Sequence, residues 1–127
     1  MKFPYMELTF GSSPIIPVDL EAEKRTRVLA YVDSGATYSI FSHEICTVIG
    51  LDLKDGEKVY ITVGDGGSIP VFIHPVKIRV GEIKFEAKVG FSEKLGIGVN
   101  ILERRTVFDR FFICFNDKDR YLTIEEI

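Results

Sequence analysis

One aspartate stands where an apolar strand should end. Asp33 follows the apolar run 28–32 (VLAYV) and precedes three small residues, Ser34, Gly35 and Ala36. A carboxylate held beside a low-dielectric interior is suited to general acid–base chemistry, in which it takes a proton from a reacting group or returns one. Because neither Gly35 nor Ala36 has a side chain large enough to cover the carboxylate, Asp33 is the candidate catalytic residue.

The same tripeptide also fits an ordinary turn, because Asp, Ser and Gly are residue types that turns prefer. The glycine-rich segment GDGG at 64–67 can also be interpreted either as an ordinary turn or as part of a functional site. Asp65-Gly66 favours a tight hairpin turn between two alternating runs. No helix is expected directly after it, so the segment is not a dinucleotide-binding loop. Neither segment establishes a function by itself.

The remaining chemistry-bearing residues are scattered. Cys46 and Cys114 lie far apart without metal-ligand spacing, and we expect both to be buried free thiols. His43 and His74 are isolated, and we expect them at the surface or in packing contacts. We therefore expect neither a metal nor a cofactor.

Length and composition narrow the function classes. The chain has 127 residues, 46% of them hydrophobic and 28% charged, which predicts one globular domain over 1–127. A net charge of -3 gives no electrostatic basis for binding nucleic acid or an acidic membrane. No run is long and apolar enough to span a bilayer, and the N-terminal segment MKFPYMELTF alternates with polar residues instead of forming a signal peptide. We expect a cytoplasmic protein.

Alternating apolar and polar residues dominate, so the fold class is mostly β. Turns are expected at 11–14 (GSSP), 64–67, 81–82 and 116–119. The expected strands are 2–10, 15–22, 27–33, 58–63, 68–73, 74–80, 82–91, 98–102, 112–117 and 120–126.

Two short helices are expected, one at 42–51 and one at 104–111. In the first, Ser42 is a suitable N-cap, Glu44 lies in the first turn and Gly50 fits the position after the C-cap. The segments 28–45 and 95–112 share an order of apolar strand, sharp turn and short helix, which suggests two related halves around a centre.

These landmarks together resemble the retropepsin-like aspartic proteases over nearly the whole chain. They are VDSGAT at 32–37, VGDGGSIPV at 63–71 in the place of the flap, and GVNILERRTVFDRF at 98–111 in the place of the second psi-strand and its helix. The resemblance implies a closed β-barrel with one or two short helices that forms a two-fold homodimer. It also implies an aspartic endopeptidase whose partners are a peptide or protein substrate and a second copy of the chain.

The resemblance assigns roles to residues. Two Asp33 carboxyls, one from each subunit, would share a proton and activate a water molecule. Ser34 would brace the paired loops, and Gly35 would accept substrate backbone. The other residues expected to bind substrate are Ala36 and Thr37 beside the aspartate and, in the flap, Gly64, Asp65, Gly66 and Gly67.

Residue 103 departs from the family pattern. Retropepsin-like chains normally have two apolar residues and then Gly at the second psi-turn, whereas Ile101 and Leu102 are here followed by Glu103. Glu103 could change the chemistry of the aspartate pair, form an ion pair with Arg104 or Arg105, or mark a chain without proteolytic activity. Two alternatives to the protease therefore stay open: a silent retropepsin-fold dimer that serves as a protein-interaction module, and a β-barrel binding protein with an incidental turn aspartate.

Overall fold

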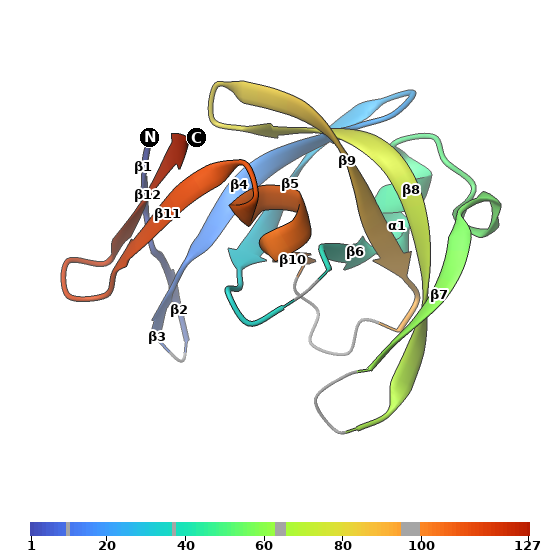
Figure 1. The fold of residues 1–127 in the computed structure, drawn as a ribbon, viewed down its shortest axis with the longest axis horizontal. Helices are drawn as coiled ribbons and strands as arrows, with labels where there is room; N and C mark the ends of the chain where they lie inside the picture. The colour runs from blue at the N-terminus through green and yellow to red at the C-terminus, as the bar shows by residue number, and fades with distance from the viewer. Residues whose placement is uncertain (10, 37, 63–65, 95–99) are drawn as a thin grey trace.

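The computed structural model describes residues 1–9, 11–36, 38–62, 66–94 and 100–127, and it is built mostly from β-strands (Figure 1). The helical elements are α1 (His43–Val48), the 3-10 turn η1 (Leu53–Asp55) and the π-helical turn η2 (Arg104–Phe108). The strands are β1 (Lys2–Pro4), β2 (Met6–Leu8), β3 (Gly11–Ser13), β4 (Ile15–Glu21), β5 (Arg25–Val32), β6 (Ile40–Ser42), β7 (Glu57–Thr62), β8 (Ser68–Val80), β9 (Ile83–Ser92), β10 (Asn100–Leu102), β11 (Phe111–Asn116) and β12 (Tyr121–Glu126). The mostly β prediction is confirmed.

The largest sheet has the strand order β4-β5-β10-β6-β9-β8-β7, and β4 also pairs with β8. Two antiparallel hairpins supply most of it, because β8 pairs with β7 on one side and with β9 on the other. β10 lies between β5 and β6 and runs parallel to β5. The sheet thus brings the end of β5 and the end of β10, which are about seventy residues apart in the chain, to the same place.

A second sheet joins the two ends of the chain, in the order β1-β12-β11 (Figure 1). β11 and β12 form the expected C-terminal hairpin, and Arg120 adopts a positive φ of 61° in its turn. β1 pairs with β12 on the side away from β11, and the N-terminal amine of Met1 donates to the carbonyl of Ile124 at 2.8 Å. The N- and C-terminal segments therefore form one layer.

The N-terminal prediction is wrong in two respects. The expected strand 2–10 is divided into β1 and β2, and the expected turn 11–14 contains the strand β3, which pairs with β2. The division falls at Tyr5, whose N–H donates to the carbonyl of Arg120 at 2.8 Å. β1 and β2 thus have different pairing partners, and the chain changes sheets between them.

The core follows the alternation of each strand. On β8, Val76, Ile78 and Val80 are buried, whereas Pro75 and Lys77 are exposed. In the described part of the chain, nineteen buried residues from the two larger sheets, η2 and α1 with its C-cap form one apolar cluster. The cluster includes Val32 of β5 and Leu102 of β10, so it packs against the strands that position Asp33.

The expected cap residues of the first helix are confirmed. The hydroxyl of Ser42 accepts a hydrogen bond from the N–H of Glu44 at 3.2 Å, and Gly50 follows the C-cap with a positive φ of 89°. The second helix is shorter than predicted, since Phe111 already begins β11. Among the described residues, no helix is long and apolar enough to cross a membrane.

The two cysteines have different environments. Cys46 is a buried free thiol, and desolvation raises its pKa to about 11, which favours the unreactive protonated form. Cys114 is also a free thiol, as predicted, but the prediction that it is buried is wrong, because its side chain is exposed. Cys114 lies on β11, where alternate side chains point out of the sheet, and it shares the outward face with Phe112. His74 is a packing residue, as expected, with Nε2 2.9 Å from the carbonyl oxygen of Leu53.

Asp19 on β4 provides a first test of the structure. It is 8% exposed and accepts a hydrogen bond from Nε of Arg27 at 2.9 Å, which lowers the pKa of Asp19. The folded-state pKa then lies below the unfolded value, so the contribution to stability is present at neutral pH and lost as the pH falls through the folded pKa. Because the Arg27 side chain is largely exposed, we expect Asp19→Asn to lower the free energy of unfolding at pH 7 by about 1 kcal/mol or less.

Urea unfolding of both proteins between pH 7 and pH 2 checks this expectation. The difference between the wild type and Asp19→Asn should shrink as the pH falls below about 4. Glu21→Gln, which removes the ion pair of Glu21 with Lys84, is the matched control and should have a smaller effect at pH 7, because the side chain of Glu21 is more exposed than that of Asp19. A difference for Asp19→Asn that stays constant down to pH 2 would contradict the assignment.

Candidate active site

The end of β5 and the end of β10 position Asp33. The two strands are parallel neighbours, with Leu102 beside Val32 in the register. The N–H of Asp33 donates to the carbonyl of Leu102 at 3.0 Å, one residue beyond the last paired strand residue. The backbone of Asp33 is therefore fixed by the second strand of the pair.

The loop after Asp33 folds back on the aspartate side chain. The N–H of Gly35 donates to Oδ1 of Asp33 at 2.8 Å, and the N–H of Ala36 lies 3.4 Å from the carbonyl oxygen of Asp33. A Cβ atom added to Gly35 would lie 3.3 Å from Oδ1, a tight contact that favours glycine at this position. Among the described residues, no group donates a hydrogen bond to Oδ2 of Asp33. The backbone thus orients one carboxylate oxygen, and the other has no donor among the described residues.

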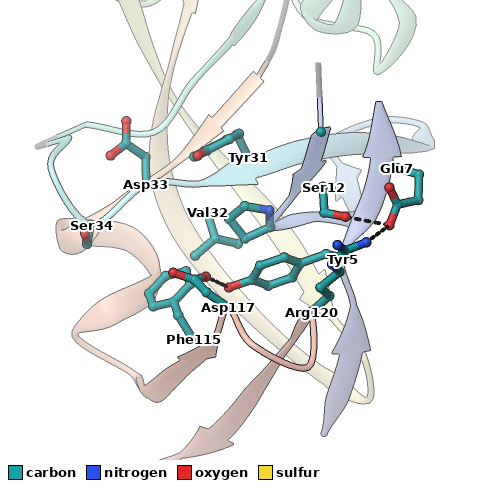
Figure 2. A pocket seen from close by; sticks show the side chains of 12 residues that line it. Tyr5, Glu7, Ser12, Tyr31, Val32, Asp33, Ser34, Phe115, Asp117 and Arg120 are labelled. Carbon is teal, nitrogen blue, oxygen red and sulfur yellow. Dashed lines mark hydrogen bonds and ion pairs between the residues drawn. The ribbon is translucent and has the colours of Figure 1, made fainter. Parts of the chain in front are cut away.

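Asp33 lies at the rim of an open hollow of about 880 Å³ (Figure 2). Asp33 is half-buried and Ser34 is exposed, and Tyr31 from β5 lies beside them. Residues from the N-terminal strands and the C-terminal hairpin complete the lining, including Tyr5 and Arg120. The volume is in the range that ligand sites occupy in proteins.

Polar side chains are paired along the side of the hollow away from Asp33 (Figure 2). The hydroxyl of Tyr5 donates to Oδ1 of Asp117 at 2.6 Å, and burial together with this hydrogen bond raises the pKa of Tyr5. Arg120 pairs with Glu7 at 3.4 Å, and Glu7 also accepts from Ser12. These contacts join the N-terminal segment to the C-terminal hairpin along the wall of the hollow.

The structure places the other predicted site residues only in part. Ser34 and Gly35 are exposed next to Asp33, and Ala36 is half-buried. Gly66 and Gly67 are exposed between β7 and β8, and Gly66 has a positive φ of 88°. Thr62 pairs with Ser68 across this connection, so the expected hairpin is confirmed. Thr37, Gly64 and Asp65 lie outside the described residues.

Glu103, the departure noted in the sequence, is fully buried. Its Oε1 accepts hydrogen bonds from the hydroxyl of Ser39 at 3.0 Å and from the N–H and hydroxyl of Thr106 at 3.0 and 2.6 Å. The Thr106 N–H lies three residues on, so Glu103 occupies the position of an N-cap for η2. The side chain of Arg105, one of the two arginines considered as a partner of Glu103, lies outside the described part of the structure.

The described residues contain no group of three or more His, Cys, Asp and Glu side chains that could hold a metal ion. The arrangement at Asp33 instead provides a carboxylate, a backbone donor and an adjoining hollow. This set is suited to proton transfer with a bound water or substrate.

Sequence reasoning missed two groups of residues. Tyr5, Asp117 and Arg120 line the hollow, but their side chains reach it only because the two chain ends pair in space. Ser39 and Thr106 were missed as the partners of Glu103. For Thr106 a signal existed, because an acceptor side chain three residues earlier in the chain is the spacing of a helix cap.

Comparisons with known proteins agree with this geometry. No family model matches the chain, and no curated protein matches it. Among solved structures, a retropepsin-like aspartic protease from Rickettsia conorii has a TM-score of 0.68 at 15% identity, and the match covers 98% of each chain. The EIAV protease, solved in complex with the inhibitor HBY-793, has a TM-score of 0.57 at 22% identity, with 78% of this chain and 88% of that chain covered. The chain therefore has the fold of the retropepsin-like aspartic proteases.

Proposed function

We propose that this protein is an aspartic endopeptidase that hydrolyses peptide bonds as a homodimer. The observation that carries the proposal is the placement of Asp33 in this fold. Its backbone is fixed by Leu102, Oδ1 is oriented by Gly35, and the carboxylate lies beside a hollow large enough for several substrate residues.

Two carboxyl groups are needed for the chemistry. One must be ionised to take a proton from the attacking water, while the other holds a proton that it gives to the peptide carbonyl oxygen. The water oxygen then bonds to the carbonyl carbon, and the C–N bond breaks as the amine takes up a proton. Because each chain carries a single aspartate in this setting, a second copy supplies the other Asp33.

The C-terminal hairpin supports association of two copies. Among the described strands, β11 pairs only with β12, so its other edge presents unpaired backbone groups. Phe112 on this strand is 69% exposed. An unprotected edge with an exposed aromatic side chain favours pairing with another chain.

The surrounding residues have supporting roles in the proposal. The Ser34 hydroxyl braces the two aspartate loops against each other, and Gly35, Ala36 and Thr37 contact substrate. The segment of Gly64, Asp65, Gly66 and Gly67 at the end of the β7–β8 hairpin acts as a flap that folds over substrate and excludes water. In the same proposal, 1–127 is one domain and pairing of β4 with β8 closes its main sheet into a barrel.

The second candidate is a retropepsin-fold dimer without proteolytic activity that serves as a protein-interaction module. The observation that favours it is Glu103, a buried carboxyl at a turn where the family pattern has glycine.

Incubation of the purified protein with a diverse peptide library, with and without a transition-state mimic such as pepstatin, tests the proposal. Mimic-sensitive cleavage supports the protease. A folded dimer that cleaves nothing at any pH supports the interaction module. Sedimentation that shows only monomer at micromolar concentration would overturn both candidates.

The pH profile of cleavage provides an independent prediction. Activity should fall on both sides of an optimum, because one carboxyl of the pair must be protonated and the other ionised. The optimum should lie on the acid side of neutrality, since both groups are carboxyls. Cleavage rates measured at saturating substrate from pH 3 to pH 9 check this, and a rate that rises steadily to alkaline pH would point to another catalytic group.

A further inference from the structure

Glu103 contacts the loop that carries Asp33 through Ser39. The loop begins at Asp33, whose N–H bonds to the carbonyl of Leu102, and it ends at Ser39 before β6. Ser39 donates its hydroxyl to the carboxylate of Glu103 at 3.0 Å and accepts the N–H of Glu103 at 3.3 Å. The two ends of the Asp33 loop are thus held by two consecutive residues, Leu102 and Glu103.

The carboxylate of Glu103 is itself held firmly. Thr106 bonds to the same oxygen, Oε1, through both its N–H and its hydroxyl. Glu103 and Ser39 are almost completely inaccessible to water, at 0% and 1% exposure. In a buried site a polar group that is left without its hydrogen-bond partner carries a large penalty. This cluster therefore has one favoured arrangement.

The far end of the loop has a further attachment. The carbonyl of Ser39 accepts the N–H of Gly90 on β9 at 2.8 Å. Ser39 therefore connects Glu103, the Asp33 loop and the long β8–β9 hairpin. A shift of the Glu103 side chain would displace Ser39 and with it the loop whose other end carries Asp33.

We propose that Glu103 is a positioning residue that fixes the Asp33 loop between β10 and β6. The assignment of a role in catalysis rests on the proposed function. Glu103 touches neither substrate nor the reacting atoms in this proposal, and it acts through Ser39 and the backbone of Leu102. A glycine at residue 103 could keep the backbone contacts, including the N–H bond to the Ser39 hydroxyl, but not the three bonds that Ser39 and Thr106 donate to the Glu103 side chain.

Amide hydrogen exchange tests the positioning role without any activity measurement. The Asp33 N–H, bonded to Leu102, reports on the loop, and the Ile124 N–H, bonded to Met1, reports on the terminal sheet. We expect Glu103→Ala to speed exchange at Asp33 about tenfold more than at Ile124, because the loop opens locally. Glu103→Gln should stay within about threefold of the wild type, since its amide oxygen can replace Oε1 as the acceptor of all three bonds.

Two further variants keep the test specific. Thr106→Val removes one of the three bonds to Oε1 with little change of shape, and it should speed Asp33 exchange less than Glu103→Ala. This variant also serves if Glu103→Ala does not fold. Asp19→Asn alters another buried acid, which lies on β4 and pairs with Arg27 of β5, six residues before Asp33. This variant should leave the ratio of Asp33 to Ile124 exchange unchanged.

Cleavage kinetics test the consequence for catalysis. Glu103→Ala should lower kcat about tenfold or more with little change in KM, and Glu103→Gln should restore kcat to within about threefold. If the wild-type protein cleaves no peptide, the proposed function fails, while Asp33 exchange still decides the positioning role. Equal acceleration at Asp33 and Ile124, or a Glu103→Gln variant as impaired as Glu103→Ala, would overturn the inference.

Discussion

Replacing Asp33 with Asn should abolish peptide cleavage. Asn has nearly the same shape and keeps an oxygen that can accept the N–H of Gly35, so the loop is expected to stay in place. The Asn amide can neither take a proton from water nor hold one for transfer between pH 3 and pH 9, the range over which cleavage is measured. We expect kcat to fall on the order of 10³-fold, within the range that general acid–base catalysis contributes, while the free energy of unfolding changes by about 1 kcal/mol or less.

A mixing experiment shows whether two aspartates form one site. Subunits of wild type and Asp33→Asn are combined at fixed total concentration and allowed to exchange. If both aspartates of a dimer are needed, activity falls as the square of the wild-type fraction, so an equal mixture retains about a quarter of the activity. A linear fall to about half would mean that each chain carries an independent site and would contradict the shared pair. Glu82→Ala, an exposed substitution in the turn between β8 and β9 and outside the hollow, provides a folded subunit as the exchange control.

The parts of the fold that follow from local pattern could be predicted from the sequence. The apolar run 28–32 predicts a strand because its residues are β-branched or apolar and end at turn residues, and the structure has β5 there. Ser42 and Gly50 predict the limits of α1 because capping depends on neighbouring residues in the chain. These features need no knowledge of distant contacts.

The misplaced features depend on partners far away in the sequence. Apolar and polar residues alternate over 2–10 as they would in one strand. However, β1 pairs with β12 and β2 pairs with β3, so the strand is broken where the pairing partner changes. Cys114 is apolar and looks like a core residue, yet the register of β11 on β12 turns it outward. A period-2 pattern indicates that a strand has two faces without saying which face is covered.

The candidate site divides in the same way. Asp33, Ser34 and Gly35 are adjacent in the sequence, so their motif predicts a displayed carboxylate. The partners of Glu103 come from two segments, one of them 64 residues away at Ser39, and no local pattern connects them. Sequence comparison with the family pattern identified Glu103 as unusual, but only the structure shows that Ser39 and Thr106 surround it.

Phe91 should be among the residues on which stability depends most. Its side chain is fully buried on β9, with its ring centroid 6.2 Å from that of Phe41 and 5.8 Å from that of His74. Phe41 is the neighbour of Phe91 across the parallel β6–β9 pair, and β6 also pairs with β10. A cavity at Phe91 would therefore lie behind the strands that position the candidate site.

We expect Phe91→Ala to lower the free energy of unfolding by about 3–5 kcal/mol, because both the transfer of the ring from water and its packing contacts are lost. Phe91→Leu should recover much of this loss by filling part of the cavity. Tyr60→Ala removes an aromatic ring that is 67% exposed, and as the matched control it should cost about 1 kcal/mol or less. Urea unfolding at one protein concentration measures all three. A Phe91→Ala effect no larger than that of Tyr60→Ala would contradict the packing of β9 against β6, because only a loosely filled interior tolerates the loss of a whole ring.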